Sequence, residues 1–561
     1  MDSAANFAES RENIEIYRKD HFTMKRLTGT TVARGFLISA SFLVFAAQAP
    51  LLAQDFPSPF VQTIAIEASA DDAVAAFYRD NGYRTLWTGA AEQDVQRRAV
   101  LFAALSKAGD HGLPVARYDV ARLTAMLTGA RTEGDRARAE VALTRAYLSY
   151  ARDISSGATD PKAIDPGIVR EISRPDPARL LSQMQARNPA QVLQDLIPVS
   201  PRYAQLMRAK LGIEAKIAQG GWGPVVKAAS LAPGESGDTV VALRDRLITM
   251  GYLTRSATSR YDAAIQAAVQ RFQLDHGLTG DGKADAATLA ALNIAPQERL
   301  KSLIVAMERL RWMHDTPLGD RHIWVNLPDF TSKIIDHGKV TFETRAVVGK
   351  NVPAQRTPEF SDMMAHMVIN PSWGVPRSII VSEYLPLLQR NPNAVSHLQV
   401  IDNRGRVVPR GAVNFAGYSA RTFPFGLRQP PSDGNALGLV KFMFPNKHNI
   451  YLHDTPSKNL FSHDVRAYSH GCIRLADPFD FAYALLSLQT DDPQGEFERH
   501  LKTRNETTVK LDRKVPVHLV YFTAWPGAKG QMTYRRDIYE RDAKLFQALE
   551  AAGVVLPSVQ G

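Results

Sequence analysis

The N-terminal half of the chain has the apolar spacing of helices. Within residues 139–154, Leu143, Tyr147, Tyr150 and Ile154 recur at three- to four-residue intervals, which is the spacing of one helix face. Residues 70–78 have helical composition, and Ser69 with Asp72 three positions later forms an imperfect capping box. These patterns predict a helical scaffold domain over residues 60–230, in which no catalytic residue types cluster.

Residues 231–298 predict a compact bundle of three short helices. Their inward positions are Val240, Leu243, Leu247 and Met250, then Ile265, Val269 and Phe272, then Leu289 and Leu292. Gly251 is typical of a helix end, Asp285 of a helix start, and Gly280-Asp281-Gly282 of a turn. This arrangement resembles the peptidoglycan-binding domain that accompanies many cell-wall enzymes. A three-helix bundle without a ligand, or a spacer, is the alternative.

From Arg321 onward the pattern changes to that of strands. Alternating or continuously apolar runs predict strands at 322–327, 341–348, 367–369, 439–444, 450–453 and 515–522. Residues 376–420 differ, with a helical patch followed by polar loops and short strands, and predict an insertion that covers the sheet. The expected fold is therefore multidomain α+β. A mainly β domain occupies residues 318–530, and residues 531–561 form a C-terminal tail.

Composition and charge exclude several classes of protein. The chain has 561 residues, of which 22% are charged, so it is not a disordered protein. Its formal net charge of +10 is spread along the chain without basic clusters that interleave with aromatic residues, which argues against nucleic-acid binding. The single cysteine excludes an internal disulfide framework and a Cys-rich zinc module.

The first 53 residues have the layout of an export signal. A basic segment from Met24 to Arg34 precedes an uncharged, mostly apolar stretch over residues 35–53. We expect translation to start at Met24 and cleavage to follow Ala53. The alternative is an uncleaved membrane anchor, because 19 uncharged residues can just span a bilayer. Export makes the lone Cys472 notable, because a free thiol is easily oxidised outside the cytoplasm.

Two short motifs carry the candidate chemistry. On the strand at 450–453, Tyr451 and His453 alternate with apolar neighbours and should therefore project from one face. Cys472 follows Gly471 and precedes Arg474, on a loop at the end of a strand. An imidazole can take the thiol proton, Arg474 favours the thiolate or binds a carboxylate, and backbone N–H groups can hold an oxyanion. The structural alternatives are a buried apolar cysteine, a hydrogen-bonded histidine and an ion-paired arginine.

Metal binding is a further alternative for this region. His448, His453, His463, His470 and Cys472 lie within 25 residues, but their spacing matches no standard zinc pattern. The sequence therefore predicts neither a metal site nor any other cofactor.

At these residues the sequence resembles the YkuD-type L,D-transpeptidases. The signature is a histidine, about fifteen residues, and then Ser-His-Gly-Cys, an apolar residue and Arg or Asn. Here it is His453, the fifteen residues 454–468, and Ser469-His470-Gly471-Cys472-Ile473-Arg474. The resemblance extends to the large Gram-negative form, which has an N-terminal scaffold, a peptidoglycan-binding domain and a catalytic domain with a capping insertion.

The resemblance implies a role for each residue of the signature. Cys472 would attack the carbonyl between the third and fourth residues of a peptidoglycan tetrapeptide stem and release D-Ala. His453 would be the base, the Gly471 and Cys472 amides would hold the oxyanion, and transfer of the thioester to a neighbouring amine would give a 3–3 cross-link. His470 would line the site. The other residues expected to shape the donor site are Arg474, Ser469, Tyr451 and Trp373.

The resemblance also implies partners and a location. We expect a periplasmic protein that acts on peptidoglycan stem peptides, with cell-wall synthesis enzymes as further partners. An uncleaved signal would anchor it in the inner membrane. Two alternatives stay open: the same acyl-enzyme with water or an envelope-protein amine as acceptor, and a non-catalytic protein that only binds the wall.

Overall fold

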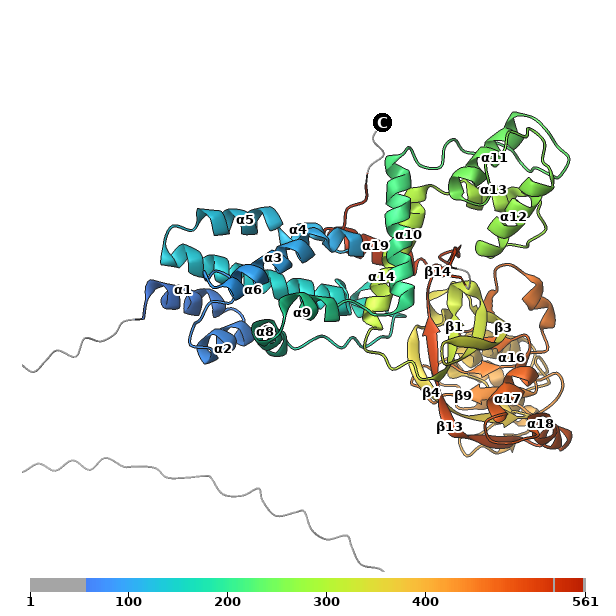
Figure 1. Cartoon of the computed structure of the whole chain (residues 1–561). Helices are drawn as coiled ribbons and strands as arrows, with labels where there is room; N and C mark the ends of the chain where they lie inside the picture. The colour runs from blue at the N-terminus through green and yellow to red at the C-terminus, as the bar shows by residue number, and fades with distance from the viewer. Residues whose placement is uncertain (1–56, 528–529, 558–561) are drawn as a thin grey trace, which may run out of the picture. The chain divides into compact units, whose positions relative to one another are not determined.

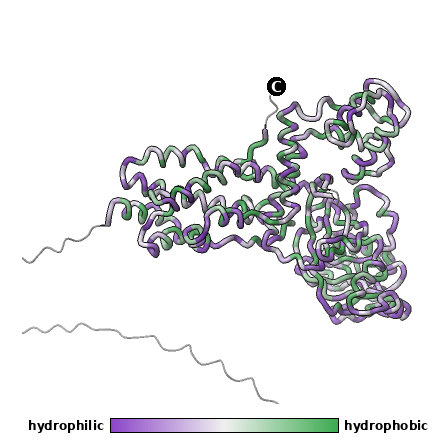
Figure 2. Tube along the Cα trace, viewed as in Figure 1, coloured by the Kyte–Doolittle hydropathy of each residue, from purple (hydrophilic) through white to green (hydrophobic). Residues whose placement is uncertain are grey.

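The computed structural model describes residues 57–527 and 530–557 (Figure 1). The export signal predicted within residues 1–53 lies outside the described residues. Among the helices in these ranges, none has the length and apolarity to cross a membrane. Hydrophobic and hydrophilic residues alternate along the helices, as expected where each helix has one buried face (Figure 2).

The N-terminal part is helical, as the apolar spacing predicts. Leu143, Tyr147 and Ile154 are fully buried on α6, and Tyr150 is nearly so. The Thr132 side chain and the Asp135 carboxylate form a reciprocal capping box at the start of α6. The helices are α1 (Pro59–Ala68), α2 (Asp72–Asp80), α3 (Glu92–Ser106), α4 (Val115–Tyr118), α5 (Val120–Gly129), α6 (Glu133–Ser156), α7 (Pro161–Ile164), α8 (Pro177–Ala186), α9 (Pro189–Asp195) and α10 (Pro201–Ala218).

The start of α2 differs from the prediction. Ser69 ends α1 instead of capping α2. The cap is Asp71, whose carboxylate accepts hydrogen bonds from the backbone N–H groups of Ala73 and Val74. The helix predicted over residues 70–78 therefore begins two residues later, at Asp72, because Asp71 and not Ser69 is its cap.

The predicted three-helix bundle is present. Its helices are α11 (Asp238–Met250), α12 (Ala263–Asp275) and α13 (Ala286–Leu292). The inward positions expected from the sequence are buried together, except Met250, which is half-buried at the edge of the cluster. Asp285 caps α13 through the Thr288 N–H, and Gly251 ends α11 in the left-handed conformation.

Residues 531–557, assigned from the sequence to a C-terminal tail, form regular structure. Strand β15 (Met532–Tyr534) pairs with β14 (Ala524–Pro526). Helix α19 (Arg541–Ala551) buries Leu545 and Leu549 against Leu300 and Ile304 of α14 (Pro296–Trp312). The C-terminal segment is therefore part of the packed core.

The C-terminal domain is built on a sheet of nine strands that closes on itself. The strand order is β11-β3-β12-β10-β9-β4-β13-β1-β2, and β2 also pairs with β3. Strand β2 did not stand out in the sequence. The strands are β1 (Arg321–Asn326), β2 (Thr331–Asp336), β3 (Lys339–Gly349), β4 (Phe360–Ile369), β9 (Val440–Met443), β10 (Leu452–His453), β11 (Ala467–Ser469), β12 (Ile473–Leu475) and β13 (Thr507–Val520). Helices α17 (Pro478–Leu486) and α18 (Pro493–Lys502) follow β12.

A separate small sheet forms the segment that we call the cap, residues 373–429. Its order is β5-β8-β6-β7, formed by Trp373–Gly374, Gly426–Gln429, Gln399–Ile401 and Val407–Val408. The predicted helical patch contains a π-helical turn (Ile380–Tyr384) followed by α16 (Leu385–Arg390). The cap has its own apolar cluster, which includes Trp373, Leu388 and Phe415. It extends beyond the predicted limits of 376–420 because its sheet includes β5 and β8.

Candidate active site

The register of the closed sheet brings the two sequence motifs together. Strands β10 and β12 are parallel neighbours, with Leu452 opposite Ile473 and His453 opposite Arg474. The Ile473 N–H donates to the Tyr451 carbonyl over 3.0 Å. Cys472, the residue before β12, therefore lies beside Tyr451 and His453, although the sequence separates it from them by about twenty residues.

Cys472 is the last residue of a tight loop, residues 469–472, between β11 and β12. The Ser469 hydroxyl donates to the Cys472 carbonyl over 2.5 Å and accepts the Gly471 N–H over 3.1 Å. Gly471 has φ of +115°, which L side chains rarely adopt, and a Cβ atom there would lie 3.2 Å from Ile450. The loop conformation thus depends on the Ser469 hydroxyl and on glycine at position 471.

This geometry differs from the expected oxyanion site. The sequence resemblance assigned the oxyanion to the Gly471 and Cys472 amides, but the Gly471 N–H is bonded to Ser469. Ser469, expected to shape the donor site, is buried, and its hydroxyl bonds to backbone groups of the loop. The sequence identifies the Ser469 hydroxyl and the Gly471 and Cys472 amides as part of the site, but it does not show which of these groups hydrogen-bond to each other.

His453 is buried on β10, and its Nδ1–H donates to the carbonyl of Asp454. Burial, reinforced by the Arg474 cation, lowers the pKa of His453 to about 3, although the carbonyls of Asp454 and Leu437 act in the opposite direction. The imidazole is therefore neutral at physiological pH. With the proton on Nδ1, the other ring nitrogen carries a lone pair that can accept a proton.

The Cys472 thiol is partly exposed and has polar groups on several sides. It donates to the Asn449 carbonyl over 3.5 Å. Desolvation raises the pKa of Cys472 to about 11, whereas hydrogen bonds from Tyr451 and the charge of Arg474 act to lower it. The resting pair of thiol and imidazole is therefore neutral, and the thiolate, once formed, has two stabilising neighbours.

Tyr451 and Trp373 form one wall of the site. The rings of Tyr451 and His453 have centroids 5.6 Å apart, so the two side chains share a face as the alternation predicts. The Tyr451 hydroxyl hydrogen-bonds both Cys472 and the Trp373 side chain, and desolvation raises the pKa of Tyr451 well above its usual value. Tyr451 therefore stays protonated and can donate to a thiolate.

Arg474 is a largely buried cation with spare hydrogen-bonding capacity. Its Nε is buried without a hydrogen-bond partner. Burial lowers the pKa of Arg474, while the neighbouring Cys472 acts to raise it. A guanidinium in this state can bind an incoming carboxylate through its fork of N–H donors.

The cap contacts the 469–472 loop through a residue that sequence reasoning missed. The Nε2 atom of His470 lies 2.7 Å from Oε1 of Glu383, in the π-helical turn. Lys441 on β9 was also missed; it lies opposite His453 in register and contributes to lowering the His453 pKa. The alternation of residues 439–444 could have placed Lys441 on the His453 side, whereas nothing local links Glu383 to His470.

The described residues contain no group of three or more His, Cys, Asp and Glu side chains arranged to hold a metal ion. The side chains that the site does present are a thiol, a neutral imidazole and a cation. Together these groups suit acyl transfer through a thioester.

Comparisons with known proteins give three family matches. Residues 320–506 match the L,D-transpeptidase catalytic domain, residues 72–209 the scaffold domain, and residues 236–292 the "Putative peptidoglycan binding domain". A Haemophilus influenzae protein named "Putative L,D-transpeptidase" is 31% identical over 247 residues, which cover 44% of this chain. The chain spans about half the length of this curated relative, 49%.

Two solved L,D-transpeptidase structures are also similar to part of the chain. The Xylanimonas cellulosilytica structure is 16% identical, covers 53% of this chain and 99% of its own, and has a TM-score of 0.17. The Stackebrandtia nassauensis structure is 15% identical, with coverages of 53% and 96% and a TM-score of 0.20.

Proposed function

We propose that the protein cross-links peptidoglycan through a thioester on Cys472, because residues 320–506 match the L,D-transpeptidase catalytic domain. The donor is a tetrapeptide stem, the leaving group is its terminal D-Ala, and the product is a 3–3 cross-link. The observation that carries this proposal is the partly exposed Cys472 thiol immediately before β12, the strand paired with the one that holds the neutral His453, with Tyr451 and the charge of Arg474 acting on the thiol.

The acylation step follows from the protonation states of this site. His453 takes the Cys472 proton as the sulfur attacks the carbonyl carbon between stem residues three and four. The resulting oxyanion collapses, the C–N bond breaks, and the departing amine of D-Ala takes the proton from His453. Tyr451 and Arg474 stabilise the negative charge that develops on sulfur during attack, which offsets the high pKa of the thiol.

The second step regenerates the enzyme. The amine of a neighbouring stem attacks the thioester carbon, an amide bond forms, and the Cys472 sulfur leaves and regains its proton through His453. Water would compete with the amine at this stage. The cap, which contacts the loop through Glu383 and His470, is placed to restrict water, and this favours transfer over hydrolysis.

Recognition of the donor involves residues around the thiol. Arg474, with its unpartnered Nε, is proposed to bind a stem carboxylate, while Trp373 and Tyr451 form an apolar wall. His470 lies at the rim of the site, between the loop and the cap. The Cys472 N–H is proposed as an oxyanion donor, and the Gly471 N–H would join it only if its bond to Ser469 opens.

The match of residues 236–292 to a peptidoglycan-binding domain supports the same polymer as substrate. A wall-acting enzyme must work outside the cytoplasm, so we propose export directed by residues 24–53 and a periplasmic location. Whether the bundle binds the wall or serves as a spacer can be tested by pull-down of the full chain with insoluble peptidoglycan.

Intact-protein mass after incubation with a tetrapeptide donor tests the proposal directly. The native protein should gain the mass of the donor minus D-Ala, and the adduct should give a 3–3 dimer when an acceptor stem is added. Cys472→Ala should form neither adduct nor dimer, and Ser487→Ala, at an exposed hydroxyl remote from the loop, should behave like the native protein. Dimer formation by purified Cys472→Ala would refute the mechanism. Release of tripeptide without dimer would indicate a hydrolase.

A further inference from the structure

One buried threonine, Thr357, hydrogen-bonds to the backbone of the 469–472 loop. The Thr357 hydroxyl donates to the Gly471 carbonyl over 2.8 Å and accepts the Gly349 N–H over 2.9 Å. Thr357 is fully buried, so neither backbone group can turn to water if the hydroxyl is lost. The same hydroxyl thus links the end of β3 to the residue immediately before Cys472.

Tyr539, from the C-terminal segment, completes this support. Its hydroxyl donates to the Gly349 carbonyl over 2.6 Å and accepts the Thr357 N–H over 3.3 Å. Tyr539 is also fully buried, and burial raises its pKa, so the hydroxyl keeps the proton that it donates. Thr357 and Tyr539 together satisfy four backbone groups, and we refer to the two residues as the brace.

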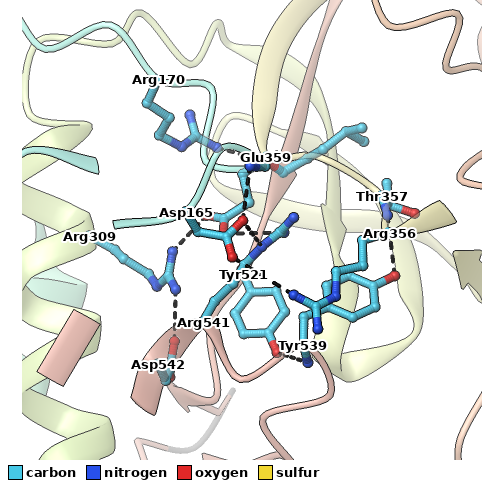
Figure 3. Close-up of polar contacts among 12 residues, drawn as sticks. Asp165, Arg170, Arg309, Arg356, Thr357, Glu359, Tyr521, Tyr539, Arg541 and Asp542 are labelled. Atoms are coloured by element: carbon cyan, nitrogen blue, oxygen red, sulfur yellow. Dashed lines mark hydrogen bonds and ion pairs between the residues drawn. The ribbon is translucent and has the colours of Figure 1, made fainter. Parts of the chain in front are cut away.

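The brace is itself anchored by buried groups from distant parts of the chain (Figure 3). The Tyr539 N–H donates over 2.8 Å to the Tyr521 hydroxyl, which donates to Asp537. The Arg541 guanidinium lies 5.0 Å from the centre of the Tyr539 ring. Arg541 is completely buried, with Asp165 at 3.5 Å and Glu359 at 3.4 Å.

The backbone beside Thr357 is also tied to the helical N-terminal part. Glu359 N–H donates to the Gly167 carbonyl over 2.7 Å, and Val169 N–H donates to the Glu359 carbonyl over 2.8 Å. Arg309 of α14 bonds the Glu359 carboxylate at 2.6 Å and Asp542 at 2.8 Å. Glu359 is therefore fixed through both its backbone and its side chain, which leaves Thr357 little freedom to move.

We propose that Thr357 and Tyr539 are positioning residues that fix the Cys472 sulfur for attack by holding the Gly471 carbonyl. Tyr539 lies outside the matched catalytic-domain residues 320–506, so a segment beyond that domain sets the geometry of its nucleophile. A displacement of about 1 Å at a reacting atom can slow a reaction by about a hundredfold. Loss of the brace should therefore lower kcat much more than it raises KM.

The test compares two rates in the full chain. One is D-Ala release from a tetrapeptide donor, which rests on the proposed function. The other is alkylation of Cys472 by iodoacetamide, which requires only a thiol. We expect Thr357→Val and Tyr539→Phe to lower kcat for D-Ala release at least tenfold with KM within twofold. Both should raise the alkylation rate at pH 8 at least threefold, because a loosened loop is better hydrated.

Matched variants separate positioning from general destabilisation. Thr357→Ser keeps the hydroxyl and should retain kcat within threefold. Tyr147→Phe removes a buried hydroxyl that donates to the Leu180 carbonyl at 3.1 Å, in the N-terminal helical core. Thr288→Val removes a buried hydroxyl in the three-helix bundle. These two controls should lower Tm without changing either rate.

Each outcome decides the proposal. Native-like kcat in both Thr357→Val and Tyr539→Phe would overturn it, and so would a Thr357→Ser protein as slow as Thr357→Val. If native protein releases no D-Ala, the proposed function fails. The alkylation rates then decide the brace alone: faster alkylation in the two variants supports it, and unchanged rates reject it.

Discussion

The resting state of the thiol can be tested by the pH dependence of alkylation. With a pKa of about 11, the thiolate fraction of Cys472 rises tenfold per pH unit and reaches its maximum only above pH 11. In the unfolded chain the pKa is about 8.5, so at pH 7 the folded protein has about 300-fold less thiolate. A more basic thiolate is a better nucleophile by roughly 13-fold for this difference, with a Brønsted coefficient of about 0.45. We therefore expect folded protein to react roughly 20-fold more slowly than unfolded protein at pH 7.

The assay is the rate of iodoacetamide addition, followed by intact mass between pH 6.5 and 10.5. Because the chain has one cysteine, the single adduct reports Cys472 without ambiguity. Tyr451→Phe and Arg474→Gln should each slow the reaction at fixed pH, since each removes a group that lowers the thiol pKa. A native rate that levels off below pH 8 would refute this reasoning, because it would indicate a stable thiolate–imidazolium pair.

Two further predictions concern buried carboxylates. Gly438→Ala should lower the free energy of unfolding by about 2–4 kcal/mol, as measured by urea unfolding. Gly438 has φ of +61°, and a Cβ atom there would lie 2.2 Å from the Asp454 carboxylate. Gly434→Ala, where a Cβ atom meets no neighbour within 4 Å, is the control and should leave the free energy of unfolding nearly unchanged. Glu140→Gln should cost about 2–4 kcal/mol, because its buried carboxylate accepts bonds from five different donor groups and an amide cannot accept them all. Exposed Glu133→Gln on the same helix is its control, and equal unfolding midpoints for the two variants would contradict this account.

Local patterns predicted the elements whose side chains repeat with a clear period. The face of α6 that contains Tyr147, and the shared face of Tyr451 and His453 at the start of β10, follow from spacing alone. Strand β2 was not predicted because Thr331–Asp336 begins with three polar residues, although Ile334 and Ile335 are buried. The regular structure after residue 531 was not predicted because its apolar residues are buried through packing against α14, which is distant in the sequence.

Some features of the site can likewise be predicted from local motifs, whereas others depend on contacts between distant parts of the chain. The identities of Cys472, His453 and Arg474 are readable from two short motifs, and the strand register that joins them follows from the fold. The partner of His470 is 87 residues away in the cap, and Tyr539 is 182 residues from Thr357. No spacing rule links residues so far apart, so these contacts require the structure.

The distant contacts explain how a neutral thiol can still be useful in catalysis. A site that keeps Cys472 protonated at rest protects a lone cysteine from oxidation, but it forms thiolate only during attack. Such a site depends on positioning more than on thiolate concentration, because sulfur, base and carbonyl must align at the moment of proton transfer. The buried brace at Gly471 and the cap contact at His470 restrain the two residues that precede the nucleophile. Cys472 reactivity toward a small electrophile and its rate of acyl transfer should therefore change in opposite directions when the brace is removed.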